Sequence, residues 1–243
     1  MIKVVLFDMD GTLLGMDENL FLKLYMSSLY EYCFEKDKYQ VKQAAEMILS
    51  SVKEMAFDDN QNMTCMEKFY HYFSKKLLPS SDINSYIPKF DAYYLTPYYL
   101  TCKKATFEKE YMKKAIQYLL DKGYRICITT NPIFPKVGIL KRLEWAGLNK
   151  DDFEFVTYGE NSHFIKPNLN YYKEILSRLN VKENEVLMVG NDVEEDMISG
   201  TLGFQTYLVM DHLLSRNNKE NEIQNRGSSQ DFYNYVRENL WEL

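Results

Sequence analysis

Short β-rich runs that alternate with helical patterns in the second half of the chain constrain the fold more than any other feature. The runs lie at 124–130, 152–158, 185–191 and 205–210. Alternation of this kind predicts a parallel sheet, because each helix carries the chain back to the same end of the sheet. Runs that are apolar on both faces, such as RICITT at 125–130, are typical of strands covered by helices on both sides. We therefore expect an α/β, Rossmann-like core of three layers around a parallel sheet.

The first strand of this sheet is expected at 2–8, far from the others in sequence. The residues between about Gly15 and Lys104 contain helical patterns and no convincing strand. These patterns cover 19–35, 39–57, 63–78 and 80–95. The sequence thus predicts two domains: a core formed by 1–15 and 105–243, and an inserted all-helical cap domain at 16–104.

Capping and proline signals locate the ends of several helices. Ser80, Ser81 and Asp82 form an expected N-cap cluster. Prolines disfavour helical backbone in the preceding residue, so helix boundaries are expected at Pro79, Pro88 and Pro97. In the core, helical patterns lie at 108–123, where Gly123 is a stop signal, at 168–179 and at 231–243.

Composition excludes several classes of function. The net charge of -6 and the absence of a basic block argue against nucleic-acid and acidic-membrane partners. The four cysteines, which form no CxxC pair, favour free thiols in a reducing compartment, so we expect a cytoplasmic protein. The N-terminal apolar run is too short for a signal peptide, and no apolar run is long enough to span a membrane. We expect a monomer or a weak homodimer that acts on a small molecule.

Polar residues follow the predicted strands. They are Asp8 and Asp10, Thr130 and Asn131, Lys166, and Asn191, Asp192 and Asp196. Ligands of parallel sheets bind beyond the carboxyl ends of the strands, so these side chains are expected in one crevice. Carboxylates, a hydroxyl and an ammonium suit Mg²⁺ and a phosphoryl group, since Mg²⁺ prefers oxygen ligands and no histidine or cysteine cluster offers a softer site.

The order of these motifs resembles that of haloacid dehalogenase superfamily phosphatases with a C1-type helical cap. The matching motifs are DMDGT at 8–12, ITTN at 128–131, Lys166 in KPN, and GNDVEED at 190–196. The insertion between the first two motifs also lies where this family carries its helical specificity cap. The resemblance implies a Mg²⁺-dependent phosphatase that hydrolyses a small-molecule phosphate monoester through an aspartyl-phosphate intermediate.

The resemblance also implies a role for each matching residue. Asp8 would be the nucleophile, and Asp10 would protonate the leaving alcohol and later activate water. Thr130, the Asn131 backbone N–H and Lys166 would hold the phosphoryl group and offset its charge. The Mg²⁺ ligands would be the Asp8 carboxylate, the Asp10 carbonyl and Asp192. Gly11 suits a tight turn, which a hydrogen bond from Thr12 would lock.

The last motif departs from the common family pattern. Asn191 stands where an aspartate usually follows the glycine, and Asp192 comes next. The DxxxD spacing makes Asp192 the expected metal ligand. Asp196 is expected beside it, either as a second ligand or as a residue that orients the first, and Asn191 is expected to support the site in the same way.

Other interpretations of these motifs stay open. The two N-terminal aspartates are also compatible with a capped helix near Leu13, and Lys166 with a solvated lysine before a helix-starting proline. A sugar-phosphate mutase and a non-catalytic protein that binds a phosphorylated ligand share the motif set. A receiver-type signalling domain also combines acids, Thr and Lys, but in a different order and a shorter chain.

The predicted cap contains no arginine and many aromatic residues. Without a cap arginine, only lysines or backbone groups are expected to bind a charged substrate tail. Some aromatic rings are candidates for stacking on a nucleobase or sugar, although packing within a helical bundle is the favoured interpretation for any single ring. These rings are Phe21, Tyr25, Tyr30, Tyr70, Tyr93, Tyr94, Tyr98 and Tyr99. His163, three residues before Lys166, is a weaker candidate for the site.

Overall fold

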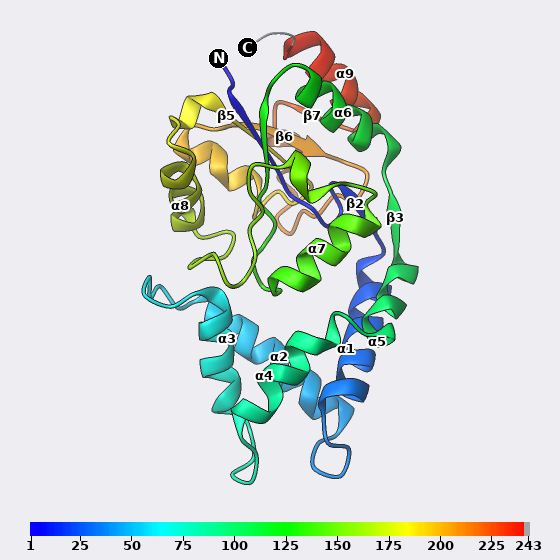
Figure 1. Cartoon of the computed structure of the whole chain (residues 1–243). Helices are drawn as coiled ribbons and strands as arrows, with labels where there is room; N and C mark the ends of the chain where they lie inside the picture. Colours follow the sequence, from blue (N-terminus) through cyan, green and yellow to red (C-terminus); the bar gives the residue numbers. More distant parts are fainter. Residues whose placement is uncertain (241–243) are drawn as a thin grey trace.

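The computed structural model describes residues 1–240 as an α/β core next to a group of helices. In Figure 1 the sheet and its flanking helices form the upper part, and α1 to α5 form the lower part. The strands are β1 (Val4–Phe7), β2 (Leu14–Met16), β3 (Thr106–Glu108), β4 (Arg125–Ile128), β5 (Val186–Gly190), β6 (Gln205–Val209) and β7 (Arg226–Gly227). The helices are α1 (Glu18–Cys33), α2 (Val41–Ala56), α3 (Cys65–Ser74), α4 (Ile83–Tyr93), α5 (Pro97–Leu100), α6 (Glu110–Asp121), α7 (Lys136–Trp145), α8 (Leu169–Leu179) and α9 (Ser229–Asn239).

The core sheet is parallel and has the strand order β4-β1-β5-β6-β7. Strand β1 lies between β4 and β5, where Val4 pairs with Arg125 on one side and with Val186 on the other. Alternate residues of β1 pack on opposite faces, as the period of two requires. Val5 and Phe7 pack with α6, α7 and α9, whereas Val4 and Leu6 pack with α8. The predicted three-layer α/β fold is confirmed.

The segment predicted as a strand at 152–158 does not form one. It runs beside β4, where Glu154 and Thr157 donate to the carbonyls of Ile126 and Ile128, but only Val156 makes a β-bridge. A 3₁₀ turn at Lys150–Asp152 and a turn after Thr157 leave too few extended residues for a strand.

Two further predictions about the elements differ from the structure. Pro88 was expected at a helix boundary but lies inside α4, where the buried face formed by Tyr86, Phe90 and Tyr93 offsets the lost backbone hydrogen bond. The polar stretch before α9 contains β7, which is too short and polar to recognise. The predicted N-cap at Asp82 is confirmed, since its side chain accepts from Asn84 N–H. The last residues of the helix predicted at 231–243 lie outside the described residues.

Two short strands connect the core to the helices. Strands β2 and β3 pair antiparallel, so the chain leaves the core and returns to it side by side (Figure 1). Gly15 lets the Phe107 ring pack closely here, because a Cβ at this position would meet that ring at 2.2 Å. The helices between these strands enclose their own aromatic cluster, which includes Phe34, Phe73 and Tyr86.

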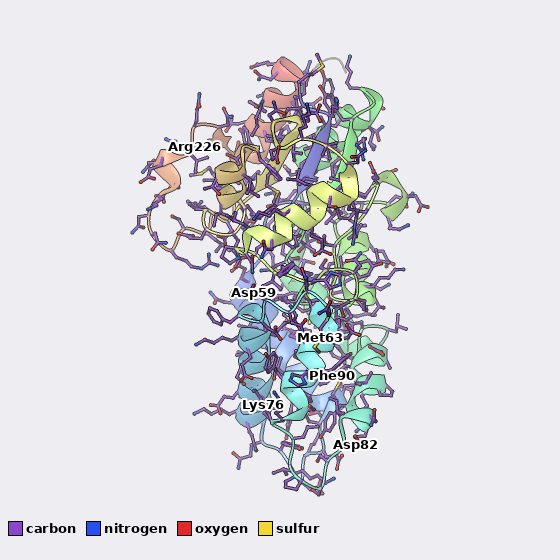
Figure 2. All side chains as sticks on the ribbon, turned by 90° about the vertical axis from the view of Figure 1, so that its left-hand side faces the viewer. Asp59, Met63, Lys76, Asp82, Phe90 and Arg226 are labelled. Carbon is purple, nitrogen blue, oxygen red and sulfur yellow. The ribbon has the colours of Figure 1, made fainter. Side chains whose placement is uncertain are left out.

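The helical part also contacts the core through the start of α3. The backbone N–H groups of Cys65 and Met66 donate to the carbonyls of Ser162 and Gly159. Figure 2 shows Asp59 and Met63 in the loop that faces the core, where Asp59 accepts a hydrogen bond of 2.7 Å from Asn168. Phe90 lies within the helices and Lys76 and Asp82 toward their far end, while Arg226 belongs to the opposite part of the molecule. The helical part therefore contacts the core at two places, at the β2–β3 pair and at the start of α3.

The four cysteines, Cys33, Cys65, Cys102 and Cys127, are buried and free, as predicted. None of the helices described within residues 1–240 is long and apolar enough to cross a lipid bilayer.

Candidate active site

The carboxyl end of β1 presents Asp8 at the centre of the sheet. All four β1 residues are buried, and the Asp8 backbone N–H continues the ladder by donating to the Val189 carbonyl at 2.9 Å. Asp8 is itself buried and lines a cavity of about 130 Å³. Thr130, Asn131, Asp192 and Asp196 line the same cavity. The expected gathering of the strand-end residues is thus observed.

Lys166 lies between the carboxylates of Asp8 and Asp196. Its ammonium lies 2.9 Å from Asp8 Oδ1 and 2.5 Å from Asp196 Oδ1. Lys166 is only 2% exposed, so it is not the solvated lysine of the alternative interpretation. Burial disfavours its charge, but Asp196 and Asp8 outweigh burial and raise the pKa of Lys166 well above its usual value. The ammonium therefore stays charged between two carboxylates.

Asp196 is held in place by the backbone of its own loop. Its Oδ2 accepts from the Asp192 N–H at 3.1 Å, and Gly190 leaves the space that the carboxylate occupies. A Cβ on residue 190 would meet Asp196 Oδ2 at 2.1 Å. Burial raises the pKa of the Asp196 carboxyl, while Lys166 opposes this shift. Asp196 thus holds the Lys166 ammonium and the Asp192 backbone in place.

Asp10 pairs with an arginine that the sequence analysis did not select. Arg142 of α7 donates to Asp10 Oδ2 at 2.5 Å, and its guanidinium lies 4.0 Å from the centre of the Phe134 ring. Burial raises the pKa of the Asp10 carboxyl; Arg142 lowers it and Asp8 raises it further. Asp10 Oδ1 is buried and has no hydrogen-bond partner within residues 1–240. A carboxyl group with a raised pKa suits proton transfer near neutral pH.

Arg142 also corrects the expectation that only lysines or backbone groups are available to a substrate near the helices. It comes from the core but is 1% exposed and lines the cavity between the core and α1 to α4. Its place on the buried face of α7 beside Ile139 and Leu143 was the available signal. An arginine in an apolar helical stripe requires a buried partner.

Thr130 and Asn131 follow β4, on the opposite side of Asp8 from β5. Thr130 is buried, and its carbonyl accepts hydrogen bonds from the hydroxyls of Thr157 and Tyr171. The Asn131 amide donates to Glu195 at 3.0 Å, while its Oδ1 is buried without a partner among the described residues. Both residues line the cavity near Asp8.

Asn191 fixes the turn that follows Asp10. Its Oδ1 accepts from the Thr12 hydroxyl at 2.9 Å, as expected for a lock on this turn, and its amide donates to the His212 carbonyl. Gly11 has φ +82°, and a Cβ there would meet Asn191 Nδ2 at 2.4 Å. With both side-chain groups engaged, Asn191 stabilises the loop that carries Asp10.

Asp192 is surrounded by hydrogen-bond donors. Its Oδ1 accepts from the N–H groups of Glu194 and Glu195, and the guanidinium of Arg216 contacts both carboxylate oxygens at 2.9 Å. Arg216 was also missed by the sequence analysis, because it lies in a polar stretch without a pattern. Its side chain is 55% exposed, so it forms a solvent-facing clamp on Asp192.

The donor atoms fit Mg²⁺. Asp8 and Asp192 contribute carboxylates, and no softer ligand lines the cavity. Among residues 1–240 no cluster of three His, Cys, Asp or Glu side chains is suited to a metal, so a bound Mg²⁺ would rest on two carboxylates and other oxygen atoms. Burial and the Asp192 charge raise the pKa of Glu195, and burial, Asp10 and Asp192 raise that of Glu18. The carboxyl groups gathered around this cavity favour a divalent cation, which would offset their negative charge.

His163 has a different partner. Its Nδ1 lies 2.9 Å from Glu174 of α8, and its carbonyl accepts from Lys68. It does not line the cavity around Asp8.

Comparison with known proteins agrees with this geometry. The family model described as haloacid dehalogenase-like hydrolase matches residues 2–201, a range that includes Asp8, Lys166 and Asp196. The chain belongs to this hydrolase family. A glyceraldehyde 3-phosphate phosphatase from Methanothermobacter thermautotrophicus is 34% identical over 96 residues, which cover 39% of this chain and 41% of that protein.

Solved structures share the fold of this family member over its whole length. A phosphatase of the family from Thermococcus onnurineus has a TM-score of 0.62 at 21% identity and covers 99% of each chain. A putative β-phosphoglucomutase from Thermotoga maritima has a TM-score of 0.60 at 17% identity, covering 98% of this chain and 100% of its own. A magnesium-bound putative hydrolase of the family from Bacillus subtilis has a TM-score of 0.56 at 18% identity, covering 97% and 98%.

Proposed function

We propose that this family member is a phosphatase that hydrolyses a small-molecule phosphate monoester through an aspartyl-phosphate on Asp8. The observation that carries the proposal is the buried Lys166 ammonium between Asp8 and Asp196 at the end of the central strand. An ammonium in contact with the attacking carboxylate offsets the negative charge that gathers when an anionic phosphoryl group approaches.

Each residue then has a definite task. An Asp8 oxygen attacks phosphorus, the ester P–O bond breaks, and Asp10 gives its proton to the departing alkoxide. Water then attacks the phosphorus of the aspartyl-phosphate, and Asp10 accepts a proton from that water. The Asp8 O–P bond breaks, the Asp8 carboxylate is restored, and inorganic phosphate leaves. Thr130 and the Asn131 N–H hold phosphoryl oxygens, and Lys166 orients Asp8. The raised pKa of Asp10 supports its role as the acid in the first step.

Mg²⁺ would be held by the Asp8 and Asp192 carboxylates and the Asp10 carbonyl, and it would neutralise phosphoryl charge when bound. Arg216 keeps Asp192 oriented toward the cavity and limits its negative charge. Asp196 holds Lys166 and the Asp192 backbone.

We further assign the two expected domains their roles. The core of 1–15 and 105–243 would carry the chemistry, and the helical cap of 16–104 would select the substrate, since its helices line a cavity that reaches Asp10. The four free thiols support a reducing compartment such as the cytoplasm, and we expect a monomer or a weak homodimer.

The test is phosphate release from a panel of phosphate esters, with Mg²⁺ and with a chelator. Asp8→Asn should lower kcat by at least about a thousandfold, because no nucleophile remains. Asp151→Asn, a change at an exposed carboxylate, is the matched control and should leave activity unchanged. Asp10→Asn should slow esters of poor leaving groups far more than an activated aryl phosphate. Wild-type turnover by Asp8→Asn would refute the mechanism, and an isomerised product without free phosphate would indicate a mutase.

A further inference from the structure

A second cavity of about 320 Å³ lies between the helices and the core. Its walls are formed mainly by aliphatic, methionine and aromatic side chains of α1 to α4 and of the loop before α7. Representative members are Phe21, Leu29, Ile48, Val52, Phe69 and Phe134. For comparison, an engineered apolar cavity of about 150 Å³ holds a benzene molecule. The space is therefore large enough for one or two rings or a branched chain.

This cavity lies next to the site around Asp8. Asp10, Glu18, Ile133 and Phe134 line both spaces. A phosphoryl group bound next to Asp8 would therefore direct its leaving group past Asp10 into the apolar cavity. The apolar cavity therefore lies where the alcohol part of a substrate would bind, next to Asp10, the proposed general acid.

The tyrosine hydroxyls around the cavity are paired, whereas Asp10 and Arg142 keep unpaired polar atoms. The hydroxyls of Tyr25 and Tyr94 form a hydrogen bond of 2.7 Å, and the Tyr70 hydroxyl donates to Asp91. The guanidinium of Arg142 lies against the Phe134 ring, and its Nη1 donates to Asp10 Oδ2. Arg142 Nε and Nη2 and Asp10 Oδ1 are buried without a partner among residues 1–240. A sugar or a nucleobase carries more polar groups than these few atoms can pair, and each of its groups left against the apolar walls weakens binding.

We propose that the substrate is a phosphate monoester of an apolar alcohol, such as an arylalkyl or branched alkyl alcohol, whose organic part fills this cavity. The inference rests on the proposed phosphatase function and adds the chemical class of the leaving group. Sugar phosphates and nucleoside monophosphates are then poor substrates, because the apolar walls leave most of their polar groups without hydrogen-bond partners. The aromatic rings of the cap form part of these walls.

The experiment compares 3-phenylpropyl phosphate with glycerol phosphate and a nucleoside monophosphate. The first two are primary alkyl esters, so the comparison reports recognition of the organic part. Burial of a phenyl group that loses about 100 Å² of apolar surface, at about 25 cal/mol per Å², corresponds to roughly fiftyfold in kcat/KM. Equal or higher kcat/KM for either polar ester would overturn the proposal.

Leu22→Trp tests the location. Leu22 lines the cavity and is 47% exposed, so a larger side chain has room to enter from the mouth. It should lower kcat/KM for the phenylpropyl ester at least tenfold and change glycerol phosphate turnover less than about twofold. Leu100→Trp is the matched control, since Leu100 is also 47% exposed but does not line the cavity. Leu49→Trp, on α2, repeats the test if Leu22→Trp fails to fold. An equal effect on both esters would contradict the assignment.

Binding separates this inference from the proposed function. The non-hydrolysable 3-phenylpropylphosphonate should bind by calorimetry with a negative heat-capacity change, and more tightly than methylphosphonate. Selective binding without turnover of any ester would refute the phosphatase proposal and retain the ligand class. Turnover without selectivity would refute the ligand class alone.

Discussion

Replacement of Lys166 by methionine tests whether the site is held together by its buried charges. The ammonium contacts Asp8 and Asp196, and all three groups are buried. Lys166→Met has a similar size but leaves two carboxylates facing each other without compensation. Breaking a buried ion pair in this way costs about 3 to 5 kcal/mol. At roughly 2 to 4 °C per kcal/mol for a chain of this length, Tm should fall by about 10 °C.

The assay is thermal unfolding by circular dichroism near neutral pH with a chelator present, so that no cation substitutes for the ammonium. The double variant Lys166→Met/Asp196→Asn removes one of the uncompensated charges and should recover about half of the lost Tm, although catalysis stays abolished. Lys113→Met is the matched control, because the Lys113–Glu108 pair is solvent-accessible and such exposed pairs contribute little to stability. The reasoning fails if Lys166→Met melts within about 2 °C of wild type, or if the double variant is less stable than the single one.

Two further changes test the support of the site. Gly190→Ala should displace the Asp196 carboxylate, which a Cβ would meet at 2.1 Å, and lower kcat at least tenfold; unchanged kcat would contradict the need for close approach. Burial favours the neutral Asp211 carboxyl, but hydrogen bonds from Ser229 and Lys109 outweigh burial and hold the pKa of Asp211 below its usual value. The resulting stability is present above the unfolded pKa of about 3.9 and disappears as pH falls through the lower folded value. Asp211→Asn should therefore flatten the loss of Tm below about pH 4, and an unaltered acid limb in a pH series of melting curves would refute this.

The sheet and the residues at its strand ends were predictable because they depend on local patterns. A buried parallel strand is apolar on both faces, so β1, β4, β5 and β6 are recognisable from their composition alone. Asp8 and Thr130 follow directly from the ends of such strands. The segment at 152–158 is also rich in β-forming residues, but flanking turns shorten it, which no local pattern records.

Residues that act through distant partners were not predictable. Arg216 lies in a polar stretch, and its contact with Asp192 exists only because the chain after β6 folds back over the site. Pro88 carries a strong local signal for a helix boundary, but burial of the α4 aromatic residues outweighs that signal. Tertiary packing decides such cases, because the energy of one proline or one surface arginine is smaller than that of the surrounding core.

Arg142 was also not predictable, because its partner Asp10 is distant in sequence and its burial depends on tertiary packing. Its pair with Asp10 lies where the two cavities are adjacent. Asp10 stands at the boundary between an acidic space that suits a cation and phosphate and an apolar space that suits neither. A lone carboxylate at the end of an apolar cavity is costly, and the guanidinium of Arg142 compensates it while the Phe134 and Phe21 rings cover that guanidinium. Paired with Arg142, Asp10 can face the acidic cavity on one side and the apolar cavity on the other. Because Asp10 precedes the helical insertion and Arg142 follows it, this boundary depends on a contact between two residues that lie far apart in the sequence.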